Sequence, residues 1–111
     1  MDEPDIDIYN WKKLINFMKK FEIMTLTKGT LGESKAKDFS KSLDELVSQL
    51  GGKIENKDYW GKRKLAYAIR KETDGFYEVT LFEIPEDKIT NLKTKLNMES
   101  NLVRYLITAS S

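Results

Sequence analysis

The fold is decided by residues 53–84, KIENKDYWGKRKLAYAIRKETDGFYEVTLFEI. Residues 53–59 and 64–70 have the composition of strands and are joined through Trp60-Gly61, where the glycine indicates a bulge or a bend. We interpret the two runs as one kinked strand. Thr73-Asp74-Gly75 is a turn signal, and residues 76–84 are rich in aromatic and β-branched side chains. The stretch therefore predicts two antiparallel strands joined as a hairpin.

The residues before this hairpin predict one strand and one helix. Residues 21–27, FEIMTLT, are rich in apolar and β-branched side chains and stop at Lys28-Gly29, which indicates a strand that enters a loop. Between residues 33 and 50 apolar side chains recur at helical spacing, and Gly51-Gly52 follows where a left-handed C-terminal cap needs glycine. The apolar positions of this helix are Phe39, Leu43, Leu46, Val47 and Leu50.

The residues after the hairpin predict a second helix and a last strand. Pro85-Glu86-Asp87 suits a first helical turn, because proline lacks an N–H that would be unpaired there and acids favour the positive end of the helix dipole. Ile89, Leu92 and Leu96 supply the buried side of this helix, and residues 101–109 indicate a strand. The order is that of an α+β, ferredoxin-like βαββαβ fold, a four-stranded antiparallel sheet with two helices on one face.

The composition argues against an enzyme. The chain has 111 residues, the size of one domain, with 40% hydrophobic residues and a net charge of +1. It contains no cysteine and no histidine, so the common thiol nucleophile, general base and metal ligands are missing. We expect no catalysis, no cofactor, no metal site and no small-molecule substrate. No apolar run approaches the ~20 residues that cross a bilayer, so we expect a soluble protein with no membrane partner.

One face of the predicted sheet lacks a cover. In residues 76–84, Tyr77, Val79 and Leu81 point to one side of the strand. The other side carries Phe76, Thr80, Phe82 and Ile84. Both sides are apolar, so we expect a partner protein on the face that the helices leave open. Two alternatives remain, namely cover by an N-terminal helix and scattered exposed apolar residues without a role.

The N-terminal segment differs from the rest of the chain. Four apolar residues at steps of three, four and three predict a helix over roughly residues 7–18, and the first ten residues hold four acids and no base. We divide the chain into an extension, residues 1–17, and a domain, residues 18–111. If the extension covers the open face, its removal should strengthen partner binding. The apolar residues are Ile8, Trp11, Ile15 and Met18, and the acids are Asp2, Glu3, Asp5 and Asp7.

Residues 53–71 hold seven basic residues against only two acids, with aromatic residues between them. This composition suits RNA, because basic groups neutralise phosphates and aromatic planes stack on unpaired bases. The alternative is an edge strand whose lysines prevent edge-to-edge aggregation. Residues 74–79, DGFYEV, match the RNA recognition motif poorly, because Glu78 takes the place of a stacking residue, so we expect no base stacking on the open sheet.

Residues 59–69, YWGKRKLAYAI, resemble the second strand of bacterial small-subunit ribosomal protein six, a family with a pattern like W/L-G-x-R-x-L-A-Y-x-I. The resemblance covers roughly residues 18–109. The other matching segments are MKKFEI from residue 18, LGGKI from residue 50, GFY from residue 75, IPE from residue 84, LN from residue 96 and NLVR from residue 101.

The resemblance implies a structural, non-enzymatic protein of the small ribosomal subunit, acting in translation as part of a ribonucleoprotein. It implies binding to the central domain of small-subunit ribosomal RNA together with small-subunit ribosomal protein eighteen. The location would be the cytoplasmic ribosome, with an organellar ribosome left open. Phe21, where the family often has tyrosine, is either core or contact. The alternative is a stand-alone protein-interaction or regulatory module that forms a homodimer through the sheet.

The matching motifs and the strand alternation supply candidate contact residues. For RNA binding they are Lys19, Lys20, Arg63, Lys64 and Arg104. For the partner protein they are Met24, Leu26, Tyr77, Val79 and Leu81.

Overall fold

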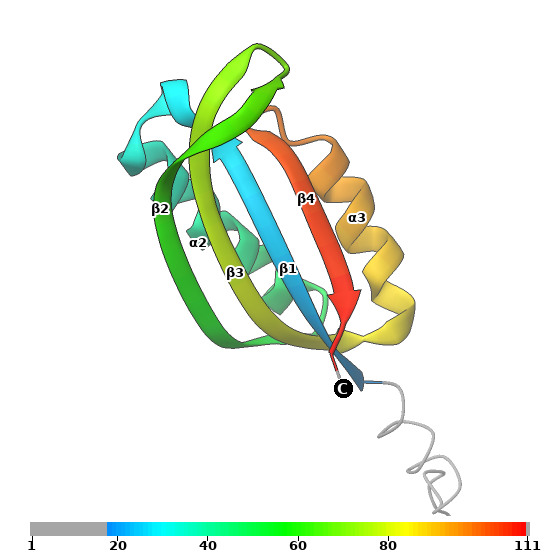
Figure 1. The fold of residues 1–111 in the computed structure, drawn as a ribbon. Coiled ribbons are helices and arrows are strands. Elements are labelled where there is room, and N and C mark those ends of the chain that lie inside the picture. The colour runs from blue at the N-terminus through cyan, green and yellow to red at the C-terminus, as the bar shows by residue number, and fades with distance from the viewer. Residues whose placement is uncertain (1–17, 111) are drawn as a thin grey trace, which may run out of the picture.

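The computed structural model describes residues 18–110 and contains one four-stranded antiparallel sheet with two helices on one face (Figure 1). The strands lie in the order β2-β3-β1-β4, so β2 and β4 are the edges. The βαββαβ prediction is therefore confirmed. The strands are β1 (Met18–Lys28), β2 (Lys53–Ile69), β3 (Glu72–Pro85) and β4 (Leu102–Ala109), and the helices are α2 (Glu33–Gln49) and α3 (Ile89–Asn97), with 3-10 turns at Gly29–Leu31 and Glu86–Lys88.

The core lies between the helices and the inner face of the sheet. Phe21 of β1 stacks on Phe82 of β3 with ring centroids 5.8 Å apart, and it is only 8% exposed. Phe21 is therefore a core residue and not a surface contact. The remaining buried core residues come from β1, β3, β4 and both helices; they are Ile23, Phe39, Leu43, Val47, Ile84, Leu92, Leu96 and Leu102.

The end of α2 follows the sequence prediction. Gly51 has φ +88°, and its N–H donates to the Ser48 carbonyl at 3.0 Å. The N–H of Gly52 donates to the Val47 carbonyl at 2.9 Å. These two bonds form a Schellman motif, in which the left-handed residue is usually glycine because it has no Cβ to clash.

The turn of the β2–β3 hairpin differs from the prediction. The chain reverses at Arg70 and Lys71, which have φ 52° and 68°, and β3 begins at Glu72. The predicted turn residue Gly75 instead lies inside β3, opposite Lys28 of β1. A Cβ at Gly75 would clash with the Leu26 side chain and lie 2.7 Å from the Thr27 carbonyl oxygen. The glycine is needed here for the close packing of β3 against β1. The prediction of a turn was wrong because a glycine required for packing cannot be told from a turn glycine in the local sequence.

The start of the first strand also differs from the prediction. Met18, expected as the last residue of a helix, is the first residue of β1 and pairs with Pro85. The strand is longer at both ends than the predicted residues 21–27 because β3 offers a partner along its full length. The rest of the predicted N-terminal helix lies outside the described residues.

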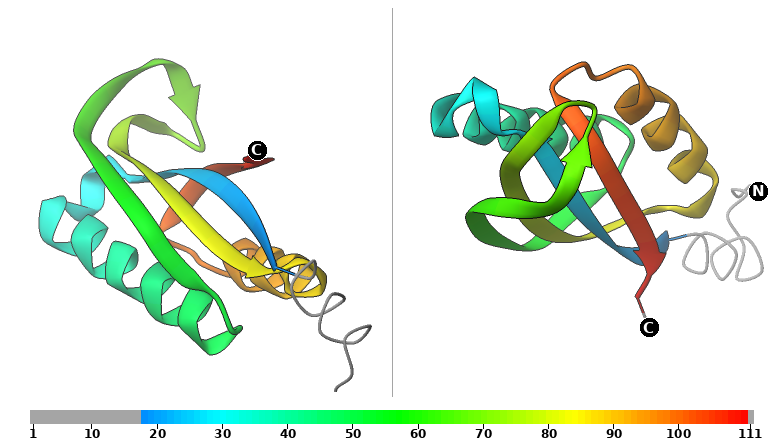
Figure 2. Two further views of the ribbon diagram at one scale, coloured as in Figure 1. Left: turned by 90° about the horizontal axis from the view of Figure 1, so that it is seen from below. Right: turned by 45° about the horizontal axis from the view of Figure 1, so that its top comes forward.

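The long strand β2 leaves the plane of the sheet at its far end (Figure 2). Gly61 has φ +80° and lies at a shift in the pairing register between β2 and β3, which confirms the predicted bulge or bend. Beyond Lys64, residues 65–68 have no partner on β3, and pairing resumes only at Ile69. This extra length carries Ile69 over the open face, where it lines one hollow together with Leu26 and Tyr77. Within residues 18–110, neither helix has the length and hydropathy needed to span a membrane.

Candidate functional site

The open face of the sheet carries a hollowed apolar surface. One hollow of about 330 Å³ and another of about 340 Å³ lie next to each other, because Met24 and Leu106 line both. Val79 and Trp60 complete the first hollow, and Tyr77 contributes to the second. This surface lies opposite the helices, and its aromatic and apolar composition is that of a protein-docking site. We call it the open-face patch, comprising Met24, Trp60, Tyr77, Val79 and Leu106.

The structure places the five partner candidates on the open side of the sheet but does not expose all of them. Met24, Tyr77, Val79 and Leu81 are half-buried, and the alternate residues of β3 are buried beneath the helices as the alternation predicted. Leu26 is only 3% exposed, because the tip of the hairpin covers it. Leu26 is therefore not available as a surface contact in this structure.

Sequence reasoning missed two prominent members of the open-face patch. Leu106 is 57% exposed and Trp60 is 44% exposed. The Trp60 ring lies 6.4 Å from the Tyr77 ring, and its Nε1–H donates to the Asp58 carboxylate at 2.9 Å. Alternation along the last strand could have placed Leu106 on this face. The bulge at Gly61 determines the placement of Trp60, and no periodicity would have revealed it.

Glu78 does not lie on the open face, so the argument against base stacking used the wrong side of the strand. It is 9% exposed and forms an ion pair with Lys57 at 3.2 Å on the helix side. The Lys57 ammonium also lies 2.9 Å from the Asp44 carboxylate and donates to the Ser40 hydroxyl at 2.7 Å. These groups form a structural polar cluster between β2, β3 and α2. The open face presents aromatic rings at Tyr77 and Trp60 instead.

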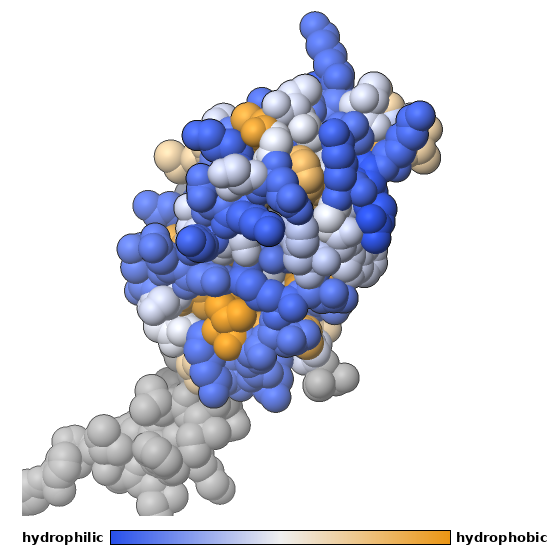
Figure 3. All heavy atoms as spheres, turned by 90° about the vertical axis from the view of Figure 1, so that its left-hand side faces the viewer, coloured by the Kyte–Doolittle hydropathy of each residue, from blue (hydrophilic) through white to orange (hydrophobic). Residues whose placement is uncertain are grey.

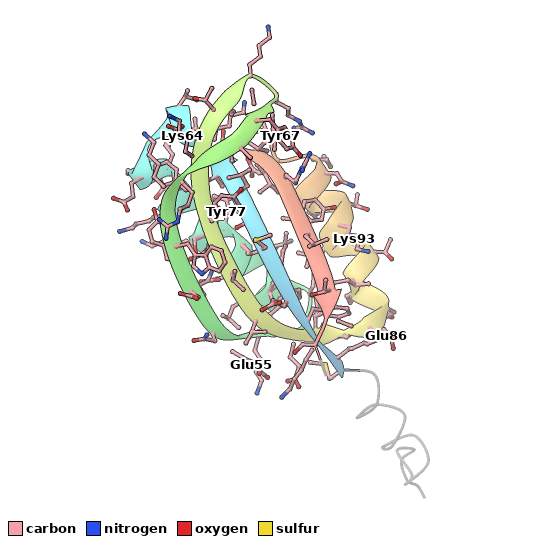
Figure 4. All side chains as sticks on the ribbon, in the orientation of Figure 1. Glu55, Lys64, Tyr67, Tyr77, Glu86 and Lys93 are labelled. Carbon is pink, nitrogen blue, oxygen red and sulfur yellow. The ribbon has the colours of Figure 1, made fainter. Side chains whose placement is uncertain are left out.

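The five RNA candidates fall into two groups at opposite ends of the sheet. Lys19 pairs with Ile84 and Lys64 pairs with Asp74, ten positions apart along β3, which corresponds to roughly 30 Å. Figure 4 shows Lys64 near the hairpin and Glu55 and Glu86 at the other end. We call the end of the sheet with Arg63 and Lys64 the hairpin end, and the end with Lys19 and Lys20 the terminal end. Arg104, opposite Leu26, belongs to the hairpin end.

The two groups differ in how their charges are compensated. At the terminal end, Lys19 lies 3.4 Å from Glu86, and Lys20 lies 3.8 Å from Glu55. Among residues 18–110, the hairpin end retains six cations without an ion pair: Lys28, Arg63, Lys64, Arg70, Lys71 and Arg104. The positive charge available to an anionic partner is therefore concentrated at the hairpin end.

The alternative interpretation of the basic second strand also has support, because β2 is an edge of the sheet. The surface around β2 and α2 is mostly hydrophilic, with only small separate apolar spots (Figure 3). Lys53 and Lys62 lie within 4 Å of carboxylates of β3, at 3.9 and 3.6 Å. Lys53 and Lys62 thus compensate neighbouring acids, and protection of this edge from aggregation stays a prediction.

The helix-covered sheet and the open-face patch define a ferredoxin-like α+β binding protein without an evident metal site, since residues 18–110 hold no group of three or more acids placed for one. Comparison with known proteins gives the family. The sequence model described as "Ribosomal protein S6" matches residues 20–109. The chain belongs to the ribosomal protein S6 family, as the resemblance of residues 59–69 indicated, and is thus a small-subunit ribosomal protein.

Individual relatives agree with this assignment. The small ribosomal subunit protein bS6 of Dictyoglomus turgidum is 37% identical over 91 residues, which cover 82% of this chain and 94% of the relative. That of Fusobacterium nucleatum is 36% identical over 90 residues, covering 81% and 96%. The crystal structure of 30S ribosomal protein S6 from Thermotoga maritima shares the fold, with a TM-score of 0.79 and 20% identity over 84% of this chain and 88% of that one.

Proposed function

We propose that this chain binds the central domain of small-subunit ribosomal RNA jointly with small-subunit ribosomal protein eighteen, within the cytoplasmic ribosome. In this proposal the open-face patch holds the partner protein and the hairpin end contacts phosphates. The observation that carries the proposal is that residues 18–110 leave an apolar surface exposed beside cations of the hairpin end that have no ion pair within that range, with Arg104 lining one of its hollows.

The open-face patch supports a protein partner rather than direct contact with a phosphate backbone. Trp60, Tyr77 and Leu106 come from three different strands and together form an apolar surface whose hollows share walls. Aromatic residues that fill such hollows contribute most of the binding energy in many protein interfaces. Burial of this patch removes apolar surface from water, which favours association.

The charge distribution supports joint rather than independent RNA binding. The chain has a net charge of only +1, so the favourable release of counterions from RNA is limited to the few cations that face the RNA. A second basic protein held on the open-face patch would extend the positive surface next to the hairpin end. We expect the isolated chain to bind RNA weakly and with a steep dependence on salt.

A binding titration tests the proposal. A labelled fragment of central-domain RNA is titrated with this chain alone, with protein eighteen alone and with both. We expect binding with both proteins that exceeds the sum of the separate affinities. Tight binding by this chain alone at physiological salt, or no binding with both proteins, would contradict the proposal. A stable homodimer of this chain without RNA affinity would favour the stand-alone interaction module instead.

A further inference from the structure

A second groove adjoins the open-face patch along the edge of β4 and shares Leu106 with it. It has a volume of about 550 Å³ and runs between β4, α3 and the tip of the β2–β3 hairpin. Figure 4 shows Lys93 on α3, the helix that flanks β4 on this side. Resting on the proposed function, we infer that this groove holds the phosphate backbone of an RNA strand and that Arg70, Lys93 and Arg104 contact it. We call it the β4 groove.

The charges of the β4 groove favour an anion. Arg70 comes from the hairpin turn, Lys93 from α3 and Arg104 from β4, so three separate elements direct cations to one hollow. Within residues 18–110, none of the three forms an ion pair with a carboxylate. Glu99 is the single acid of the lining, and one of its carboxylate oxygens accepts from the Asn101 N–H at 3.3 Å. The groove therefore has an excess of positive charge with no internal partner.

The conformation of the hairpin supports this role for Arg70. Arg70 and Lys71 both have positive φ. In two-residue hairpin turns, positions with positive φ are usually occupied by asparagine and glycine. A non-glycine residue is destabilised in this region because its Cβ crowds the backbone. The turn nevertheless carries two bases, and the bend of β2 brings Arg70 across the sheet to β4. Such unfavourable backbone geometry beside a binding groove is typical of a functional position.

The walls of the β4 groove are also ordered. The Tyr105 hydroxyl donates to the Asn97 side-chain oxygen at 2.8 Å, which joins β4 to α3 across the groove. Leu96 and Leu102 belong to the core and hold the floor in place. A preformed groove loses less conformational entropy when it binds a ligand.

Continuity with the hairpin end favours RNA over an acidic peptide laid along the edge of β4. Arg104 and Arg70 belong both to the groove and to the unpaired cations of the hairpin end. Together they form one strip that extends from β2 across to α3. An RNA strand supplies a phosphate at every nucleotide and can follow the whole strip, which matches several separated cations.

Two measurements on the complex of this chain, protein eighteen and central-domain RNA test the inference. In the first, lysine acetylation is followed by mass spectrometry with and without RNA. Lys95 is the internal control, since it is exposed on the same helix but does not line the groove. We expect RNA to protect Lys93 and leave Lys95 unchanged.

In the second measurement, RNA affinity is determined across a salt series for Arg70→Gln, Lys93→Gln and Lys95→Gln. Each groove variant should weaken binding by roughly five- to tenfold and reduce the slope of log affinity against log salt by about 1, whereas Lys95→Gln should match the unmodified chain. Equal behaviour of Lys93→Gln and Lys95→Gln would overturn the inference.

The outcomes separate this inference from the proposed function. If the unmodified complex binds RNA but the groove variants have no effect, the groove inference fails and the proposed function stands. If the groove variants weaken the heterodimer in the absence of RNA, the groove binds a protein segment, and the RNA inference is wrong. If the unmodified complex binds no RNA, the proposed function itself fails.

Discussion

Both ends of the sheet carry cations, but the two ends differ in the charges that surround those cations. At the terminal end, Lys19, Lys20 and Lys53 each lie within 4 Å of a carboxylate. At the hairpin end, Arg63 and Lys64 have no such partner among the described residues. Basic composition therefore does not by itself locate an RNA surface, because neighbouring carboxylates can already compensate a lysine.

The comparison indicates which end of the sheet contacts RNA in the proposed function. The hairpin end lies beside the open-face patch, since Ile69 and Arg104 line the same hollow as Tyr77. A partner protein on the patch would therefore extend the basic surface at this end. The terminal end lies roughly 30 Å away along β3 and would contact the same RNA only through a different part of it.

The largest expected effect comes from removal of charge at each end. Arg63→Gln with Lys64→Gln should weaken RNA binding by the heterodimer by roughly ten- to hundredfold at physiological salt and reduce the salt slope by about 2. Lys19→Gln with Lys20→Gln is the matched control and should change binding little, because both lysines are already paired. Filter binding across a salt series measures both. Equal losses from the two double variants would remove the distinction between the ends.

The next effect concerns the face between the two ends. Trp60→Ala should weaken the heterodimer with protein eighteen by about 2 kcal/mol, or roughly thirtyfold, because it removes an aromatic side chain from the centre of the patch. Tyr67→Ala is the control, since Tyr67 is 66% exposed but lines neither hollow. Calorimetric titration without RNA reports the affinity. A loss with Tyr67→Ala that equals the loss with Trp60→Ala would place the partner elsewhere.

A third prediction separates cations that stabilise the fold from cations that are free to bind. Lys57→Met should lower the free energy of unfolding by about 1–3 kcal/mol, because it leaves the carboxylate of Glu78 buried without its cation. Lys64→Met should change stability by less than about 0.5 kcal/mol, since Lys64 is exposed and has no ion pair within residues 18–110. Urea denaturation measures both. A stable Lys57→Met variant would mean that the polar cluster under α2 contributes little.

The smallest expected effect is a pH dependence in the middle of β2. Burial, followed by the hydrogen bond from the Tyr59 hydroxyl to Glu33 at 3.0 Å, raises the pKa of Tyr59 from 10.0 to about 12. Because the folded-state pKa lies above the unfolded value, this stabilisation is complete below pH 10 and is lost as the pH rises from about 10 to about 12. Tyr59→Phe should reduce this alkaline loss of stability in thermal denaturation. An unchanged pH profile would show that Tyr59 does not contribute to it.

Much of the fold could be predicted from the sequence because its signals are local. The helical spacing of α2, the glycines at its end and the alternation in β3 each involve residues close in the chain. The error at Gly75 has a different origin. Its glycine serves a close approach between β3 and β1, and a contact between distant segments is not visible in a local pattern.

The candidate site was less predictable because it depends on contacts between distant segments. The motifs supplied Arg63, Lys64 and Arg104, which do gather at one end. They supplied Lys19 and Lys20 as well, and only the structure shows the acids beside them. The fold of the hairpin over the sheet buries Leu26, and no period in the sequence indicates that bend.

The most direct test of the central claim uses the absence of cysteine in the chain. Lys64→Cys and Lys19→Cys each create a single site for an iron chelate that generates hydroxyl radicals. Each labelled chain is assembled with protein eighteen on central-domain RNA, and the cleaved nucleotides are mapped. We predict strong, localised cleavage from position 64 and weak cleavage from position 19. Strong cleavage from position 19 with none from position 64 would contradict the assignment of RNA contact to the hairpin end.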